Sequence, residues 1–309
     1  MKKQIIITGC TGFVGTNLRQ YLSQDYKLLG VSRKSNATIK VKSYQELSID
    51  DFNSSEAIIH LAGKAHDLKK TSQEQEYFIA NTELTKSMFD KFRSSRCPIF
   101  IYMSSVKAVA DKVEGVLKED AEPNPKTTYG KSKLQAEKYL KAQALNKVQR
   151  LYILRPCMIH GPNNKGNLNL LYGFIKKGIP YPLGAYKNER SFLSVENLCF
   201  IIKELLIGKV VSGTYQVSDN VPLSTNDLVH IIGQSLGKKA RILRIPKFII
   251  NTFAKIGDYF SLPLTTERLQ KLTENYIVSN TKILQEIQKE LPLTSTQGLM
   301  RTIQSFNND

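Results

Sequence analysis

The sequence predicts an α/β fold in which a doubly wound parallel sheet carries a smaller C-terminal domain. Three observations lead to this fold class. Short apolar runs recur along the first half of the chain, helical patterns separate the later runs, and a glycine-rich turn directly follows the first run. Strands that are apolar throughout and alternate with helices are typical of a parallel sheet covered on both faces.

Six segments are expected to be strands because each is short, apolar and bounded by turn-forming or polar residues. They are residues 4–8, 27–32, 57–62, 99–104, 151–154 and 214–218. Helices are expected over 15–22, 81–92 and 129–145, where the apolar residues recur with helical spacing.

The pattern loosens after Pro156, and this change suggests two domains. Residues 1–161 are expected to form a dinucleotide-binding domain, with a return segment near 190–218. Residues 162–189 and 219–309 are expected to form the substrate-binding domain. They contain loops rich in Gly and Asn and, from about residue 222, helices that we expect to have polar faces. A ligand would lie at the carboxyl ends of the strands, beneath this second domain.

Composition excludes several classes of protein. Of the 309 residues, 41% are hydrophobic and 23% are charged, as in ordinary globular proteins. No stretch approaches the ~18 apolar residues of a membrane helix. The apolar run near the start is too short for a signal peptide, so we expect a cytoplasmic protein with no membrane span. The four cysteines are far apart without a C-x-x-C pair, and neither a disulfide framework nor a metal site is expected.

The formal net charge is +17, but the lysines are distributed along the whole chain. The sequence contains no recognisable nucleic-acid-binding signature. We therefore expect a solvated basic surface that attracts an anionic small molecule, with no nucleic-acid partner.

A glycine-rich turn, Thr8-Gly9-Cys10-Thr11-Gly12-Phe13-Val14-Gly15, links the first expected strand to the first expected helix. Glycines let the backbone turn tightly and approach a pyrophosphate, while the helix amino end offers free N–H groups. The spacing, G-x-x-G-x-x-G, is one residue longer than the common dinucleotide fingerprint. It predicts a Rossmann-type domain whose cofactor contacts are Gly9, Thr11, Gly12, Phe13, Val14 and Gly15.

The end of the second strand bears on the choice of cofactor. NAD sites usually place an acidic residue there to accept from the ribose 2′-hydroxyl. This chain has Ser32-Arg33-Lys34 instead, and a hydroxyl with two cations favours a 2′-phosphate. NADP(H) is therefore expected, with Ser32 and Arg33 as contacts, while NAD(H) stays open as the alternative.

Ser105, Tyr129 and Lys133 are the expected catalytic residues. Tyr129 and Lys133 are four residues apart in a helical segment, so both project from one face. An ammonium close to the phenol would lower the pKa of Tyr129 from ~10 and make it a usable acid or base. Ser105 ends the fourth expected strand, where its hydroxyl can bind the same substrate oxygen.

These motifs together resemble the extended short-chain dehydrogenase/reductases, the NAD-dependent epimerases and dehydratases that act on nucleotide sugars. The resemblance covers nearly the whole chain. It rests on the glycine turn, His60-Leu61-Ala62-Gly63, Asn81, Ser104-Ser105-Val106, Tyr129-Gly130-Lys131-Ser132-Lys133, Leu154-Arg155-Pro156 and His160-Gly161-Pro162.

The resemblance implies a role for several of these positions. Tyr129 is the acid/base, Lys133 is its partner and a ribose ligand, and Ser105 rather than Ser104 donates to the substrate carbonyl. Leu61, Ala62, Gly63 and Pro156 line the cofactor, while Asn81 braces the neighbouring strand. In the second half, Asn167 and Arg190 contact the diphosphate of the nucleotide sugar. Members of the family often form homodimers through two helices, which here are 81–92 and 129–145.

Three chemistries share such a site. Family dehydratases carry an acidic pair after the catalytic hydroxyl, where this chain has Val106-Lys107, so dehydration is disfavoured. The segment around Ser105 is similar to reductases of UDP-linked 4-keto-6-deoxy-N-acetylhexosamines from surface-polysaccharide pathways, and Ser32-Arg33 favours such an NADPH-consuming reductase. An NAD-dependent UDP-hexose 4-epimerase is the alternative. A non-catalytic dinucleotide-binding sensor is a further alternative, which retention of Tyr129 and Lys133 disfavours.

Overall fold

A seven-stranded parallel sheet forms the centre of the protein. The computed structural model describes residues 2–33, 41–64, 73–162, 164, 167–260 and 265–306, with Asn167 described by its backbone alone. The strand order is β10-β7-β5-β4-β1-β2-β3. The strands are β1 (Gln4–Thr8), β2 (Lys27–Val31), β3 (Val41–Lys42), β4 (Ser55–His60), β5 (Ile99–Met103), β7 (Arg150–Pro156) and β10 (Gly213–Val217). The winding reverses between β1 and β4, as in the Rossmann arrangement.

All six predicted strands are present, including the predicted return segment, which pairs in parallel with β7 as β10. β3 was missed because it has only two residues. The short helix α2 (Ile49–Asn53) was also missed, although the Ser48 side chain accepts from the Asp51 amide in a capping box. In elements this short, the apolar residues do not recur often enough to distinguish a strand or helix from a loop.

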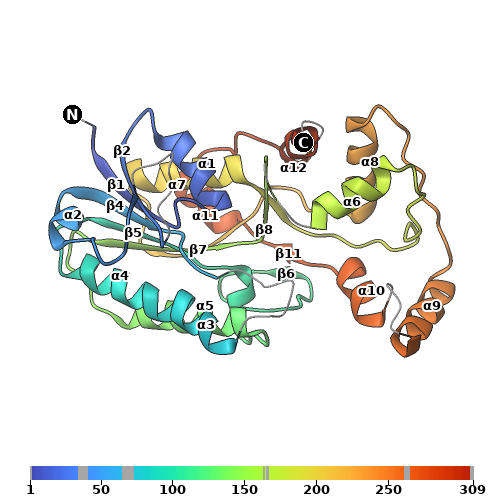
Figure 1. The fold of residues 1–309 in the computed structure, drawn as a ribbon, viewed down its shortest axis with the longest axis horizontal. Coiled ribbons are helices and arrows are strands. Elements are labelled where there is room, and N and C mark those ends of the chain that lie inside the picture. Colours follow the sequence, from blue (N-terminus) through green and yellow to red (C-terminus); the bar gives the residue numbers. More distant parts are fainter. Residues whose placement is uncertain are drawn as a thin grey trace.

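Helices cover both faces of the sheet (Figure 1). On one face lie α1 (Phe13–Leu22), α7 (Val195–Ile207) and α11 (Thr281–Ile287). On the other lie α3 (Glu74–Phe78), a π-helical turn (Ile79–Glu83), α4 (Leu84–Arg93) and α5 (Thr128–Ala142). Alternate residues of β1 divide between the two cores: Ile5 and Ile7 pack with Leu198 of α7, whereas Ile6 packs with Phe89 of α4. This period of two is what a strand buried on both faces requires.

A third hydrophobic cluster forms the smaller C-terminal domain. Its helices are α6 (Asn167–Lys176), α8 (Thr225–Ser235), α9 (Lys247–Phe260), α10 (Thr266–Thr273) and α12 (Ser295–Ser305). Two short strand pairs connect it to the sheet: β8 (Met158–His160) with β9 (Phe192–Ser194), and β6 (Val116–Leu117) with β11 (Ile277–Val278). Among the described residues, no helix is long and apolar enough to cross a bilayer.

These clusters support the predicted domain division as a proposal, with one amendment. Ile283 and Ile287 of α11 are buried in the cluster on the α1–α7 face of the sheet. We therefore propose that α11 belongs with the sheet domain, although the sequence pattern placed it with the substrate domain.

Candidate active site

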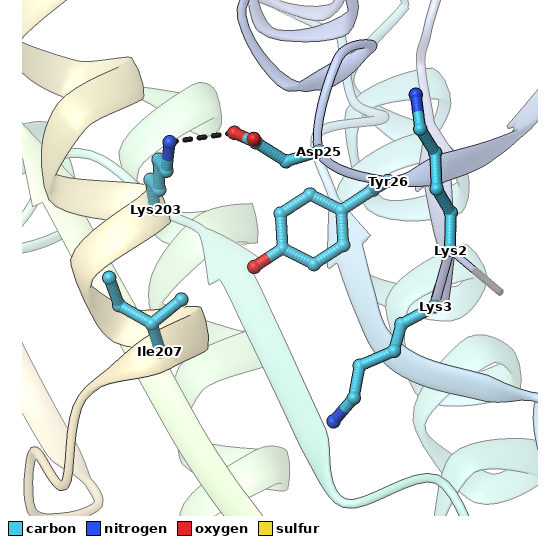
Figure 2. Close-up of a pocket in the computed structure, with 6 residues that line it drawn as sticks. All are labelled: Lys2, Lys3, Asp25, Tyr26, Lys203 and Ile207. Carbon is cyan, nitrogen blue, oxygen red and sulfur yellow. Dashed lines mark hydrogen bonds and ion pairs between the residues drawn. The ribbon is translucent and has the colours of Figure 1, made fainter.

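The predicted catalytic and cofactor-binding residues gather at one edge of the sheet. Gly9 follows β1, Ser32 follows β2, Leu61 follows β4 and Ser105 lies two residues beyond β5. Because all of these strands run parallel, their carboxyl ends meet at the same edge. Pro156 ends β7 at the same edge and is buried. Figure 2 shows a hollow at the opposite edge, lined by residues that precede β1 and β2, among them Lys3 and Tyr26. Strand direction therefore disfavours that hollow as a nucleotide site.

The glycine turn leaves no room for side chains at two of its positions. Gly9 has a φ of +65°, and a Cβ there would lie 2.9 Å from the amide nitrogen of Ala62. A Cβ on Gly15 would collide with the carbonyl oxygen of Gly9. Gly12 is the N-cap of α1 and no side-chain hydrogen bond caps that helix. The turn thus forms a close-packed backbone cradle beside the helix amino end, where a pyrophosphate fits.

Several of the other predicted turn residues also lie at this edge. Phe13 and Val14 are half-buried and pack against the core of the α1 face. The Thr11 hydroxyl lies 3.2 Å from the Ser32 hydroxyl and hydrogen-bonds to it. Arg33 is exposed, while Lys34 lies outside the described residues. The structure therefore joins the glycine turn to the end of β2, where the ribose specificity is expected to be set.

The loop after β4 connects the glycine turn to the catalytic amine. A Cβ on Gly63 would lie 3.1 Å from Nζ of Lys133, so Gly63 packs directly on the ammonium group. The buried Asn81 side chain holds this loop: its Oδ1 accepts from the Lys64 amide at 2.7 Å, and its Nδ2 donates to the Lys64 carbonyl at 3.0 Å. Asn81 lies in the π-helical turn, a feature common at functional sites. It braces the loop beyond β4 rather than a strand itself.

Lys133 is almost completely buried beneath the edge of the sheet. Its Nζ donates a 2.8 Å hydrogen bond to the carbonyl of Met103 and lies 4.9 Å from the Tyr102 ring centroid. Burial lowers the pKa of Lys133 to about 8, and the carboxylate of Glu137 opposes this shift. The ammonium is thus poised to lose its proton close to physiological pH.

Tyr129 and Ser105 are brought together as predicted. Their side chains hydrogen-bond, and this bond lowers the pKa of Tyr129. Burial raises the pKa by more, however, so the net shift is upward. The predicted lowering by Lys133 is therefore wrong for this structure. Its physical reason is that the Lys133 ammonium is directed to the Met103 carbonyl, while the half-buried phenol is desolvated.

A buried ionic network, which was not predicted from the sequence, supports these residues. Glu137 is fully buried and accepts two hydrogen bonds from Nε of Arg155 and one of 2.6 Å from its Nη2. The Ser104 hydroxyl donates to the same carboxylate at 2.5 Å. A signal was available: Tyr129, Lys133 and Glu137 recur every four residues, which places all three on one face of α5.

The predicted diphosphate residues lie farther into the C-terminal domain. Nη1 of Arg190 donates to the Lys271 carbonyl at 2.9 Å, and its Nη2 lies 4.0 Å from the Glu274 carboxylate. Arg190 is half-buried, so it is held by partners on α10 and on the segment after it. Asn167 begins α6, and its side chain lies outside the described part of the chain.

Lys107 follows Ser105 by two residues and faces the same region as Arg190. Its Nζ lies 4.4 Å from the Tyr276 ring centroid and donates to the Asp111 carbonyl at 2.9 Å. Burial lowers the pKa of Lys107, and Asp111 and Glu274 oppose this shift. The geometry provides a cation two residues from Ser105.

Two buried histidines hydrogen-bond to threonine hydroxyls. His60 is buried between the hydroxyls of Thr8 and Thr85, at 2.7 and 3.0 Å, and burial lowers its pKa to about 3. Nδ1 of His160 hydrogen-bonds to the Thr302 hydroxyl at 2.9 Å. All four cysteines are buried with free thiols.

Comparison with known proteins finds similarity over nearly the whole chain. The model of the NAD dependent epimerase/dehydratase family matches residues 5–216. The chain is 30% identical to a UDP-glucose 4-epimerase of Vibrio cholerae, over 99% of this chain and 96% of that protein. It is 28% identical to an N-acetyl-alpha-D-glucosaminyl-diphospho-ditrans,octacis-undecaprenol 4-epimerase of Escherichia coli O157:H7, over 98% and 95%. A UDP-2-acetamido-2,6-beta-L-arabino-hexul-4-ose reductase of Pseudomonas aeruginosa is 24% identical, over 88% and 66%.

Solved structures share the fold. UDP-N-acetylglucosamine 4-epimerase from Bacillus cereus matches with a TM-score of 0.79 at 19% identity, over the whole of both chains. A UDP-glucuronic acid 4-epimerase from Bacillus cereus, solved with NAD, matches at 0.76 and 17% over 99% of each chain. RMD from Pseudomonas aeruginosa, solved with NADPH, matches at 0.71 and 19% over 98% of each chain.

Proposed function

Because this chain belongs to the NAD dependent epimerase/dehydratase family, we propose that it is an NADP(H)-dependent nucleotide-sugar reductase. Its substrate is a UDP-linked 4-keto-6-deoxy-N-acetylhexosamine, whose C4 ketone it reduces for surface-polysaccharide synthesis. The observation that carries this proposal is the end of β2. There Ser32, bonded to Thr11, and the exposed Arg33 stand in place of the carboxylate that suits a free ribose 2′-hydroxyl. The positive charge of Arg33 and the hydrogen-bond donors of both side chains suit a ribose 2′-phosphate.

The residues present fit a dinucleotide. Gly9 and Gly15 keep the cradle free of side chains, and Gly63 packs against the Lys133 ammonium. The diphosphate side of the dinucleotide would be held by the residues of the glycine turn, Gly9, Thr11, Gly12, Phe13, Val14 and Gly15. The rest of the dinucleotide would be lined along the sheet edge by Leu61, Ala62, Gly63 and Pro156. When bound, NADPH supplies a hydride to the sugar carbon. Lys133 would also reach the nicotinamide ribose, because its amine lies against the loop that lines this part of the site.

The chain's own groups handle the proton. Tyr129 donates its phenolic proton to the C4 oxygen, and the Ser105 hydroxyl donates a hydrogen bond to the same oxygen. The raised pKa of Tyr129 keeps the phenol protonated, as an acid must be before reduction. Arg190 binds the sugar-nucleotide diphosphate and would exchange its contact with Glu274 for the phosphate charge. Asn167, at the start of α6, donates to a phosphate oxygen.

A second candidate is an NAD-dependent UDP-hexose 4-epimerase. The observation that favours it is the near full-length match to a UDP-glucose 4-epimerase. In that reaction Tyr129 first removes a proton from the C4 hydroxyl and later returns it. The two reactions differ in the dinucleotide they use, and the end of β2, where Ser32 and Arg33 replace a carboxylate, favours NADP(H) and hence the reductase.

Two measurements on purified protein test the proposal. The dinucleotide that copurifies is identified by mass spectrometry, and NADPH oxidation is followed with a UDP-4-keto sugar. Stoichiometric NADPH consumption that is lost by about 10²–10⁴-fold in Tyr129→Phe, with dinucleotide binding kept, supports the reductase. Tightly bound NAD with interconversion of UDP-hexose epimers would replace it with the epimerase. Dinucleotide binding with no turnover of either substrate would identify the non-catalytic sensor.

We also propose a homodimer formed through α4 and α5. The two helices pack together on the outer side of one face of the sheet, which leaves their outward surfaces free of the protein's own core (Figure 1). Analytical ultracentrifugation tests this assembly. A monomer at micromolar concentration would contradict it.

A further inference from the structure

The helix α9 presents an apolar face to solvent. It lies with α10 at the end of the C-terminal domain far from the sheet (Figure 1). Five of its side chains, here called the aromatic face, are exposed by between 41% and 84%: Phe248, Phe253, Ile256, Tyr259 and Phe260. Polar faces were expected on the helices after residue 222, and for α9 this expectation is wrong. Large exposed apolar patches mark interaction sites.

The exposure of the aromatic face does not come from a loosely held helix. Ile250, Ala254 and Gly257, which recur three or four residues apart, are buried. Ile250 and Ala254 pack in the same cluster as Leu269 of α10. Phe253, Ile256 and Phe260 repeat with the same spacing along another side of α9. One apolar stripe therefore fixes the helix, and a second stripe remains for another partner.

Hydrogen bonds hold both ends of α9. The Tyr186 hydroxyl donates to Asn251 at 3.0 Å. The Asp258 carboxylate accepts from the amide of Thr266 at 2.9 Å and from its hydroxyl at 2.5 Å, and so ties α9 to α10. The aromatic face is thus presented in a fixed orientation.

Exposed cations lie on α9 and in the segment that precedes it. Residues 238–274 contain eight Lys and Arg residues and three Asp and Glu residues. The exposed cations on and before α9 are Lys238, Lys239, Arg241, Arg244, Lys247 and Lys255. Aromatic side chains flanked by cations are typical of helices that lie in the interface of a bilayer. There the apolar face enters the headgroup region and the cations contact anionic lipids.

We propose that α9 docks the protein onto an anionic phospholipid bilayer, with the aromatic face inserted among the headgroups. Charge favours this occupant over a second copy of the chain. Two copies packed through α9 would bring together two segments rich in exposed cations, whereas a chain of net charge +17 is attracted to an anionic surface. This docking is peripheral and stands independently of the proposed function.

The docking face is connected to the candidate substrate site through α10. The carbonyl of Lys271, near the end of α10, accepts from Arg190. A few residues later, the Tyr276 hydroxyl donates to the carbonyl of Ala110 at 2.6 Å. The segment next to the docking helix therefore contacts a residue proposed to bind substrate.

Vesicle flotation of the full chain tests the proposal. Equimolar phosphatidylglycerol and phosphatidylcholine vesicles are compared with pure phosphatidylcholine vesicles. We expect the protein to float with the anionic vesicles only, and added NaCl to release it. The affinity of the double variant Phe253→Ser/Phe260→Ser for the anionic vesicles should be lower by about tenfold or more. Lys239→Gln/Lys255→Gln should weaken binding and reduce its salt dependence.

The matched control is Val148→Ser/Val211→Ser, which changes two comparably exposed apolar residues elsewhere, at 68% and 64%. It should bind like the unmodified chain. Thermal unfolding of each variant verifies that the fold is kept. Absence of binding to the anionic vesicles, or equal binding by the aromatic-face variant, would overturn the proposal. So would a dimer in solution that the aromatic-face variant abolishes while vesicle binding is absent. The proposed reductase activity, measured without vesicles, is a separate readout that these variants should leave unchanged.

Discussion

Ser104 donates a 2.5 Å hydrogen bond to the buried carboxylate of Glu137. Because of this contact, the adjacent residues Ser104 and Ser105 lie in different environments. Ser104 is directed into the ionic network beneath the sheet edge, whereas Ser105 hydrogen-bonds to Tyr129. The geometry thus supports Ser105 as the residue that meets substrate.

The two serines should respond differently to replacement by alanine. Ser105→Ala should reduce kcat by about 10²-fold, because a donor to the C4 oxygen is lost, with little change in unfolding free energy. Ser104→Ala should lower that free energy by about 1–2 kcal/mol, because Glu137 loses a donor, and should keep most of the turnover. Steady-state kinetics and urea unfolding of both variants check this. A larger kcat loss in Ser104→Ala would reverse the assignment.

Lys133 should weaken the fold at neutral pH. Its pKa of about 8 in the folded protein lies below the ordinary 10.5, so below pH 8 the folded state bears the full cost of a buried charge. The cost of burying this charge is roughly 3 kcal/mol. Replacing Lys133 removes that cost, but it also removes the hydrogen bond to the Met103 carbonyl, which offsets about 1 kcal/mol of the gain in stability. Lys133→Met should therefore be inactive yet more stable at pH 7.

The pH dependence of this gain has a definite sign. As pH rises from 8 to 10.5, the folded protein has lost the Lys133 proton and the unfolded chain still holds it, so the unmodified protein gains stability relative to Lys133→Met. The advantage of the variant should shrink over this window. Urea unfolding of both proteins at several pH values measures it. A constant difference would show that the ammonium is not strained by burial.

The glycine turn offers a pair of matched substitutions. Gly15→Ala should lose dinucleotide binding, because its Cβ would displace the carbonyl of Gly9. Gly173→Ala lies in α6 where no atom stands within 4 Å of a Cβ, and it should raise the free energy of unfolding by about 0.5–1 kcal/mol. Titration with NADPH and thermal unfolding compare the two. Unchanged binding by Gly15→Ala would place the dinucleotide elsewhere.

Cofactor preference should depend on the end of β2. Ser32→Asp would place a carboxylate beside Thr11, where it repels a 2′-phosphate and accepts from a free ribose hydroxyl. The ratio of kcat/KM for NADPH to that for NADH should fall by roughly tenfold or more. Kinetics with both cofactors measure the ratio, with Thr16→Ser as a control on the exposed side of α1. An unchanged ratio would remove the basis for assigning NADP(H).

The sequence was sufficient for six of the seven strands of the sheet and for the positions of Gly9, Ser105 and Lys133. These features follow from local rules: apolar runs define buried strands, and parallel strands bring their carboxyl ends to one edge. The direction of the Tyr129 pKa shift was not predictable this way. It depends on the orientation of the Lys133 amine, which the Met103 carbonyl and burial set through contacts distant in sequence.

The helix α9 shows a second limit. Its sequence is apolar on most sides, and a pattern alone does not tell which side is buried. Phe253 and Tyr259 are exposed because Ile250 and Ala254, on another side of the helix, pack in the cluster that contains Leu269. Glu137 was a different case, because its spacing from Lys133 was visible in the sequence and was overlooked.

The amide side chain of Asn81 bonds both the N–H and the C=O of Lys64, as the backbone of an adjacent strand would. One side chain thus extends the order of the sheet past the last residue of β4. Its position depends on the extra backbone residue that a π turn accommodates. Removing one residue from Ile79–Glu83 would rotate Asn81 by about 100° around the helix axis. The backbone of Lys64, in the loop on which the nicotinamide would rest, would then lose its two hydrogen bonds with the Asn81 side chain. Among the described contacts, no other side chain bonds this backbone.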